Sequence, residues 1–515
     1  MTFWSIITLL LYAFNWIIAV YFIIDLIFRR HNPVKSLSWI IVLLLLPFIG
    51  ILFYAYFGRN FRRTKIYSRK GLHDEKLKKE LSDRQLQLLF DHDDLIPPQF
   101  AAQKKIIRLC LNNNKSLLTQ YNRTRLFFTG KDALEAMLDY ASKAVDHIYL
   151  QSFIIENDSL GTRWKNLLIQ KSREGVDVRV IFDDFGSWHL PYAYLHALRK
   201  AGAQIVPFGK VRFPGFKAML NYRNHRKLLI VDGVAGFLGG VNIADRYYDG
   251  GTSLQWRDTH MLIEGQAVSQ LQSSFLMDWF FITHKNLRPN RPRKRRIGSR
   301  NKLAEANATA SQTPVILPEQ GLQDLTQDTL SRETCFMQIV SSGPDSDWAD
   351  IMQLYLTLIN QAQHRISLIT PYFIPNETIL NALRTAALGG VEVRILMPQY
   401  SDSKFVHYAS LSYMSDLMEA GVDVYLYTKG FIHSKVISID GTCCLVGSAN
   451  MDNRSLEHHF EIGAMIYKPQ VACEIEDQFD NDLHSSRQLS LKTWTKRPVM
   501  HKVAEAFARL LSPLL

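Results

Sequence analysis

The sequence is poor in cysteine, and its few cysteines show neither a pairing pattern nor a metal-binding spacing. Five occur in 515 residues, an odd number, without a C-x-x-C pair or a Cys/His zinc spacing. We predict that all five are reduced and structural, as expected of a domain that faces the cytosol, and that they hold no metal. They are Cys110, Cys335, Cys443, Cys444 and Cys473.

Motifs for cofactor chemistry are also missing. The sequence has no H-E-x-x-H pair of zinc-binding histidines, no paired-aspartate metal motif and no phosphate-binding P-loop. We therefore predict an active site that uses neither a metal nor another cofactor. Charge that develops during a reaction must then be stabilised by side chains of the chain itself.

Charge is absent from two long apolar stretches near the N-terminus. Residues 4–24 and 37–57 each run for 21 residues without a charged side chain. As a helix, each would be about 31 Å long, enough to cross the hydrocarbon core of a bilayer. Residues 1–70 are thus predicted to form a transmembrane two-helix hairpin. A cleaved signal peptide is disfavoured because no basic region comes first, and Pro47 and Gly50 leave a broken or re-entrant second segment open.

Positive charge is in excess. The chain has 60 Lys and Arg against 48 Asp and Glu, a formal net charge of +12, which predicts an anionic partner: nucleic acid or anionic lipid. The hairpin favours membrane lipid, and no nucleic-acid partner is expected. The basic flank at 59–70 predicts that the bulk of the chain lies on the cytoplasmic side of the membrane. Residues 285–334 form a basic and polar linker, either a solvated connection or a clamp on anionic lipid.

The rest of the sequence repeats itself. Strand-like segments at 147–155 and 175–184 are echoed by 365–374 and 390–398, at an offset of about 210 to 220 residues. Strands that alternate with helices indicate parallel sheets covered by helices. The repetition indicates an internal duplication of this unit.

The predicted fold is therefore α/β, with two homologous halves packed as a pseudo-dimer behind the membrane hairpin. A helical connector precedes the first half, and the second half ends in a C-terminal helix. The predicted boundaries are 71–124 for the connector, 125–284 for the first half and 335–515 for the second.

Each half carries the pattern H-x-K-x4-D, followed by a tail of the form G-[GS]-x-N. A His and a Lys two residues apart on a strand point to the same face, and the Gly after each Asp marks a turn. Two matching copies in a duplicated unit are hard to obtain by chance. The predicted catalytic residues are His225, Lys227 and Asp232 in the first half and His433, Lys435 and Asp440 in the second. The tail residues predicted to bind phosphate or to orient the histidines are Gly240, Asn242, Ser448 and Asn450.

A pocket with two imidazoles and two ammonium groups suits a phosphodiester. The lysines and the Ser and Asn groups can bind the phosphate oxygens. One histidine can attack phosphorus to form a phosphohistidine, while the other protonates the leaving alkoxide and then deprotonates an incoming alcohol. A carboxylate would orient each histidine. The candidates are Asp258 for the first motif and Glu461 for the second, 33 and 28 residues after the respective histidines.

The duplicated motif resembles that of the phospholipase D superfamily. The hairpin, the W-R-D-T-H segment at 256–260 and the ending at 509–515 are similar to bacterial cardiolipin synthases, over essentially the whole chain. The resemblance implies a phosphatidyltransferase that joins two phosphatidylglycerol molecules into cardiolipin and releases glycerol. It also implies one nucleophilic histidine and one general acid/base, which we assign by analogy to His225 and His433. One departure is His459, where family members usually carry Asn.

Other functions stay open at this point. One is a hydrolytic phospholipase D or a nuclease of the same superfamily, although a nuclease gains nothing from two membrane spans. Another is a phosphatidyltransferase that uses phosphatidylethanolamine. A lipid-binding scaffold without activity is disfavoured because both motifs are intact. The basic and aromatic segment 210–220 is either an ordinary loop or one that dips into the membrane interface, and the sequence does not indicate an oligomeric state.

Overall fold

The computed structural model describes residues 3–28, 33–54, 72–90, 101–210, 222–250, 255–285, 334–510 and 512. The chain forms two compact units, one of Met1–Lys65 with Val211–Tyr222 and the other of Ile66–Lys210 with Arg223–Leu515. Most of the predicted interfacial segment 210–220, the basic flank after residue 57 and nearly all of the predicted linker lie outside the described residues.

The first unit contains three described helices: α1 (Phe3–Phe28), α2 (Pro33–Leu45) and α3 (Pro47–Phe53). Among the described residues, α1 is the one helix long and apolar enough to cross a membrane, with 26 residues. The second predicted span is divided at Leu46, where ψ is 62°, and Pro47 begins α3. Proline lacks an N–H and its ring collides with a preceding helical turn, which accounts for the break that the sequence left open.

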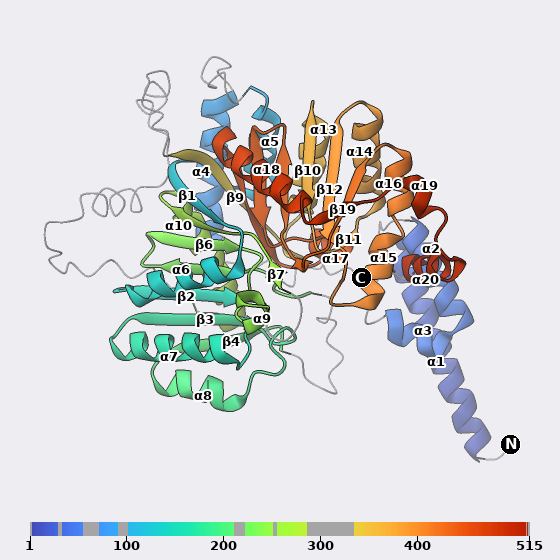
Figure 1. The fold of residues 1–515 in the computed structure, drawn as a ribbon. Coiled ribbons are helices and arrows are strands. Elements are labelled where there is room, and N and C mark those ends of the chain that lie inside the picture. The colour runs from blue at the N-terminus through green and yellow to red at the C-terminus, as the bar shows by residue number, and fades with distance from the viewer. Residues whose placement is uncertain are drawn as a thin grey trace, which may run out of the picture. The chain divides into compact units, whose positions relative to one another are not determined.

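The second unit is built on one large sheet (Figure 1). Its strands, together with two short strand pairs beside it, are β1 (Thr119–Phe127), β2 (His147–Ser152), β3 (Asp177–Asp183), β4 (Gln204–Phe208), β5 (Leu228–Val231), β6 (Ala235–Gly239), β7 (Trp256–Arg257), β8 (His260–Glu264), β9 (Cys335–Ser342), β10 (Arg365–Ile369), β11 (Phe373–Ile374), β12 (Glu392–Pro398), β13 (Asp423–Tyr427), β14 (Phe431–Ile432), β15 (Val436–Ile439), β16 (Cys443–Gly447), β17 (Met451–Asp452), β18 (Glu461–Tyr467) and β19 (Ser486–Gln488).

The order of the strands shows the duplication. The 15-stranded sheet runs β19-β13-β12-β10-β15-β16-β18-β9-β1-β8-β6-β5-β2-β3-β4. Apart from β19, the order on one side of the β9–β1 pair mirrors the order on the other, so that β5 corresponds to β15 and β2 to β10. This confirms the predicted α/β fold with two homologous halves. The first half begins with β1 at Thr119, a few residues before the predicted boundary, because β1 forms the antiparallel seam with β9.

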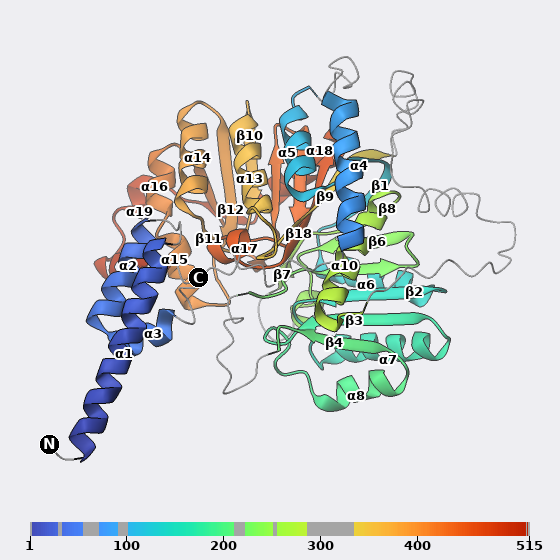
Figure 2. The same cartoon turned by 180° about the vertical axis from the view of Figure 1, so that it is seen from behind.

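Helices cover both faces of the sheet (Figure 2). The described helices of this unit are α4 (Leu72–Phe90), α5 (Lys104–Asn114), α6 (Gly130–Ser142), α7 (Ser159–Arg173), α8 (Tyr192–Lys200), α9 (Asp245–Tyr248), α10 (Ala267–Thr283), α13 (Asp350–Gln361), α14 (Glu377–Leu388), α15 (Lys404–Leu411), α16 (Met414–Glu419), α17 (Asn453–Glu457), α18 (Pro469–Leu483), α19 (Leu491–Trp494) and α20 (Val499–Leu510). Side chains at their first turns cap several of them, as Asp158 caps α7 and Asn376 caps α14.

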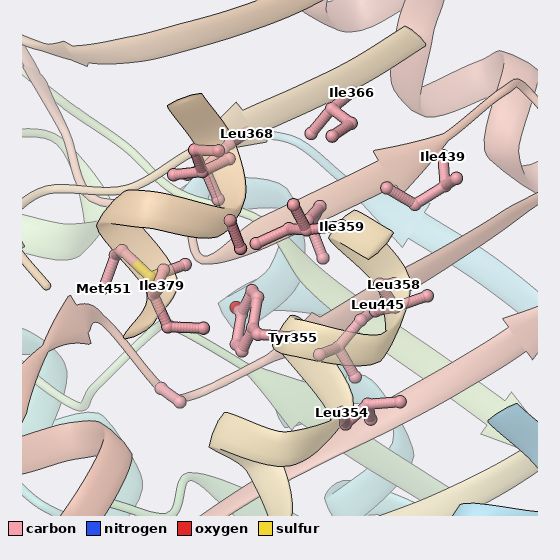
Figure 3. Packing of buried hydrophobic residues seen from close by; sticks show 14 of the residues in the cluster. Leu354, Tyr355, Leu358, Ile359, Ile366, Leu368, Ile379, Ile439, Leu445 and Met451 are labelled. Carbon is pink, nitrogen blue, oxygen red and sulfur yellow. The ribbon is translucent and has the colours of Figure 1, made fainter. Parts of the chain in front are cut away.

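Three large apolar clusters hold these layers together. Each half has its own cluster on one face of the sheet. In the second half, α13 packs Leu354 and Leu358 over Ile366 of β10 and Leu445 of β16 (Figure 3). The third cluster is shared, because α10 of the first half and α18 of the second both contribute to it. All five cysteines are free thiols; four of them are buried, and Cys473 is exposed.

Candidate active site

The two motif histidines lie at the start of matching strands, where the halves meet. His225 and Lys227 precede β5, and His433 and Lys435 precede β15. The chain ahead of each motif pairs with the other half. The backbone N–H of His225 donates to Phe460 O at 2.9 Å, and that of His433 donates to Arg257 O at 2.7 Å. The short strand β14 also pairs in parallel with β7. Both imidazoles are thus held by backbone that belongs to the opposite half.

The carboxylate partners cross between the halves. Glu461 of the second half accepts from Nδ1 of His225 at 2.9 Å. Asp258 of the first half accepts from Nδ1 of His433 at 2.7 Å. The sequence identified both acids but assigned each to the histidine of its own half. The backbone pairing across the interface explains this difference, because it places β18 beside the first motif and the end of β7 beside the second.

Burial keeps both imidazoles neutral. It lowers the pKa of His225 well below its usual range, and the nearby charges of Lys227 and Lys435 lower it further. The pKa of His433 is lowered well below its usual range by burial first and then by the same two lysines. With Nδ1–H donated to a carboxylate, the proton-free nitrogen of each neutral ring is Nε2. The site therefore presents two unprotonated Nε2 atoms.

The two lysines form the positive centre of the site. Both are buried. Lys227 Nζ donates to His225 O at 2.7 Å, and Lys435 Nζ donates to His433 O. Burial lowers the pKa of Lys227 to about 7 and that of Lys435 to about 8, and it raises the pKa of Glu461 to about 7. Among the described residues, neither ammonium group has a direct carboxylate contact, and two such buried groups form a strong site for an anion.

The tail residues support the carboxylates and the loops around the site. Ser448 Oγ donates to Glu461, and a Cβ on Gly240 would stand 2.1 Å from Asp258 Oδ1, so that only glycine permits this approach. Asn242 accepts from the N–H of Ile154 at 3.1 Å and donates to a tyrosine hydroxyl. Asn450 is buried, and its Oδ1 has no hydrogen-bond partner among the described residues.

The aspartates of the two motifs lie away from the histidines, at the far ends of β5 and β15. Asp232 accepts from three consecutive backbone N–H groups, those of residues 145–147, at 2.7 to 2.9 Å. Asp440 does the same for residues 363–365, also at 2.7 to 2.9 Å. Both have a positive φ, 53° and 52°, just before a glycine. The structure thus gives these two residues a role in fastening each motif strand to the start of its neighbour.

Two buried arginines were missed by the sequence reasoning. Arg226 lies inside the first motif. It donates to Asp278 at 2.7 Å and to Glu461 O at 3.1 Å, and so fixes the start of β18. Arg257 lies directly before Asp258 and pairs with Asp482 of α18 at 2.7 Å. The available signal was the position of each arginine beside a predicted functional residue, but the partners lie far away in the sequence.

Aromatic and histidine side chains line the two imidazoles. Ring centroids lie 5.0 Å apart for Phe153 and His225, and 5.2 Å apart for Trp256 and His433. His459 lies 5.9 Å from His225, and neither of its ring nitrogens has a hydrogen-bond partner among the described residues. Burial lowers the pKa of His459 well below its usual range, so that this ring offers a neutral donor and acceptor beside the site.

The same corner contains donors of the type that bind metals. Ligand atoms of His225, His459 and Glu461 lie within 4.8 Å of one another. The positive charges of Lys227 and Lys435 act on this cluster, and like charge disfavours a cation there. The electrostatics of the site are those of an anion site, and a phosphate fits them better than a metal ion.

Comparisons with known proteins agree with this geometry. The family described as "Cardiolipin synthase, PLD-like domain" matches residues 137–279 and 355–483. The family described as "Phospholipase_D-nuclease N-terminal" matches residues 17–59. Curated relatives include "Cardiolipin synthase" of Oceanobacillus iheyensis, 36% identical over 99% of this chain and 100% of its own length. "Cardiolipin synthase" of Geobacillus sp. strain WCH70 is 35% identical over 97% of this chain and 92% of its own length.

A solved structure shows the same fold. The phosphatidylserine synthase of Haemophilus influenzae aligns with a TM-score of 0.57 at 16% identity, over 81% of this chain and 98% of that protein. The fold and the duplicated His–Lys site are those of a phospholipase D-like phosphatidyltransferase. Within that class, the chain belongs to the cardiolipin synthase family. These relatives and α1 together indicate association with a membrane.

A pair of Asp→Asn substitutions separates the two kinds of aspartate. Asp232→Asn weakens the bonds to three backbone N–H groups, and we expect it to lower the free energy of unfolding by about 1–3 kcal/mol. The kcat of the folded fraction should stay nearly unchanged. Asp258→Asn should instead lower kcat by on the order of 10³-fold or more, because a neutral amide can select the wrong tautomer of His433 and does not stabilise its protonated form. Thermal unfolding and initial rates check both; equal loss of kcat in the two variants would contradict these roles.

The pH dependence of kcat/KM should be bell-shaped. Activity rises as pH increases through about 7, where Glu461 ionises and can hold the His225 N–H, and falls from about pH 7 to 8 as Lys227 and then Lys435 lose their protons. Initial rates between about pH 5 and pH 10 measure both limbs. Glu461→Gln should remove the acid limb, and Glu392→Gln, at a surface ion pair, should leave it in place. A flat profile for the unsubstituted protein would show that these groups do not control the reaction.

Proposed function

We propose that the chain is a cardiolipin synthase that transfers a phosphatidyl group from one phosphatidylglycerol to another and releases glycerol. The observation that carries this proposal is the crossed pair of carboxylate-anchored histidines beside two buried lysines. The names of the relatives support the choice of cardiolipin as the product. No metal, cofactor or nucleic acid takes part in the reaction that we propose.

The first step forms a bond between His225 Nε2 and phosphorus. The P–O bond to the glycerol headgroup breaks, and the leaving oxygen receives a proton from His433 Nε2. The phosphate offsets the lysine charges that lower the pKa of His433, so that a seated substrate favours its protonated form. The assignment of His225 as nucleophile is supported by its second acceptor, Ser448 O, at 3.1 Å from Nδ1, which fixes the ring further.

The second step reverses the roles. His433 Nε2 takes the proton from a hydroxyl of a second phosphatidylglycerol, whose oxygen attacks phosphorus while the P–Nε2 bond to His225 breaks. Lys227 and Lys435 stabilise the charge on the phosphate oxygens in both transition states. Aromatic side chains around His433, among them Trp256 and Tyr247, exclude water in favour of a lipid alcohol.

The finer membrane arrangement is part of the same proposal. We place the N-terminal segment in the bacterial inner membrane as a multi-pass anchor, with the catalytic unit on the cytoplasmic side. The basic residues after residue 57 support this orientation. The anchor keeps the site next to a bilayer that contains both substrates.

Purified full-length protein tests the reaction. With phosphatidylglycerol as the only lipid substrate, we expect equal amounts of cardiolipin and glycerol, measured by mass spectrometry and by glycerol release. His225→Ala and His433→Ala should each lose at least about 10³-fold of the rate. His364→Ala, at an exposed histidine, is the matched control. Formation of phosphatidic acid alone would contradict transfer and indicate a hydrolase.

A substrate with an activated leaving group assigns the two histidines. A phosphatidyl ester of p-nitrophenol needs no proton on the departing oxygen. The His433→Ala variant should therefore release p-nitrophenol and accumulate a covalent adduct on His225, which peptide mass spectrometry detects. The His225→Ala variant should do neither. The opposite result would exchange the two roles.

His459 provides a test of headgroup selection. Its half-buried ring lies beside His225 without a hydrogen bond to the described residues, and it is placed to bond a headgroup hydroxyl. We expect His459→Asn, which keeps one donor and one acceptor, to retain cardiolipin synthesis. His459→Ala should raise KM for phosphatidylglycerol relative to phosphatidylethanolamine, with a smaller effect on kcat. Competition between the two lipids measures the ratio, and an unchanged ratio in both variants would remove His459 from substrate choice.

A further inference from the structure

The C-terminal helix α20 exposes its large apolar side chains and turns two of its alanines inward. Ala508 is buried and Ala504 is half-buried. The side chains on the outside are all 57% to 77% exposed: Val499, Met500, Val503, Phe507 and Leu510. At 100° per residue, these five positions fall within an arc of about 100°. A surface helix of a soluble domain shows the opposite arrangement, with its apolar stripe against the core.

Polar contacts on the inner side hold α20 in this orientation. Glu505 is buried and forms a two-bond ion pair with Arg497, at 2.5 and 3.0 Å. Arg509 donates to Asp416 at 2.8 Å and to Ser412 O at 3.1 Å. A rotation that turned the apolar arc inward would break both ion pairs. The outward apolar arc is therefore fixed by the packing of the helix.

Charge around the arc has one sign. Between residues 491 and 510, five basic residues occur: Lys492, Lys496, Arg497, Lys502 and Arg509. The single acid is Glu505, which points inward and is paired. Lys492, Lys496 and Lys502 are exposed. An apolar stripe flanked by cations is complementary to anionic lipid, whose acyl region accepts the stripe while its headgroups meet the lysines.

The helix lies on the side of the sheet where the strand ends carry the active site, and this side is called the catalytic edge. It packs on α15, which follows the carboxyl end of β12, and the motif histidines lie at this same edge. Other exposed aromatic side chains lie in loops and turns that follow the carboxyl ends of β3, β9 and β12. They are Phe185, Trp188, Tyr192, Trp348 and Tyr400. Aromatic side chains of this kind are typical of a membrane interface.

We propose that α20 docks on the surface of an anionic bilayer and seats the catalytic edge of the second unit against it. The apolar arc inserts among the acyl chains, and the neighbouring lysines contact the anionic headgroups. The contact is separate from the N-terminal anchor and orients the site instead of only tethering it. The proposal rests on the proposed function in one respect, that the substrates are lipids in that bilayer.

Site-directed probes in the full-length protein test the contact. In a Cys473→Ser background, Phe507→Cys carries a nitrobenzoxadiazole label, and Leu388→Cys, 72% exposed and at the opposite edge of the sheet, is the matched control. In vesicles of phosphatidylcholine and phosphatidylglycerol, we expect a blue shift and quenching by acyl-chain spin-labelled lipid at position 507 only. A water-like spectrum at position 507 would overturn the proposal. A blue shift without lipid quenching would also overturn it, because it would mean that a second copy or the N-terminal unit covers the helix.

An activity measurement separates this contact from catalysis. Val503→Glu with Phe507→Glu should lower the affinity of the arc for the interface by on the order of 30-fold or more. Cardiolipin formation in vesicles should fall with it, while formation in detergent micelles should match the unsubstituted protein. Leu388→Glu should change neither. Equal rates in vesicles for the double variant and its parent would refute the docking helix, whereas absence of synthesis by the parent in micelles would refute the proposed function alone.

Discussion

The chemistry of this protein depends on two hydrogen bonds that cross from one half of the molecule to the other. Glu461 orients His225, and Asp258 orients His433. Neither motif histidine takes its carboxylate partner from its own half. The crossing is imposed by backbone pairing, because the segment before each histidine bonds to the segment before the opposite carboxylate. Arg226 adds to it by binding both Asp278 of its own half and the carbonyl of Glu461.

Burial then decides the protonation of the site. Both imidazoles are kept neutral and both lysines are brought close to neutrality, since each charged form loses its hydration. Because the lysine charges are poorly solvated, the site gains the most electrostatic stabilisation when it binds an anion. The phosphate of a lipid stabilises the charged form of both lysines. Substrate binding and the protonation state that catalysis requires are therefore linked through the same groups.

Much of the fold followed from the sequence. The duplication was visible because equivalent strands, such as β3 and β12, keep nearly the same residues, and the two-residue spacing of His and Lys on a strand placed both side chains at one edge. Asp258 and Glu461 were identified by chemistry, since a nucleophilic histidine needs a carboxylate. Their exchange between halves was not predictable, because strand pairing across an interface leaves no local pattern. The role of Asp232 was missed for a related reason: its three N–H partners lie more than 80 residues earlier in the chain.

The N-terminal region shows the limit of hydropathy. The two apolar stretches have the same length, yet Pro47 interrupts the second one and divides it into α2 and α3, so that composition alone does not fix the number of spans. In α20, the ordinary expectation that apolar residues face inward is reversed, because two ion pairs and small alanines occupy the inner side.

The crossed pairs also have a consequence for synthesis on the ribosome. The imidazole at position 225 needs a carboxylate 236 residues further along the chain. A nascent protein that has emerged only through its first half holds a His225 ring without its carboxylate and lacks His433. Reactivity towards phosphodiesters therefore begins only when translation is nearly finished, and a prematurely terminated product that reaches the bilayer through its anchor cannot degrade the lipids around it.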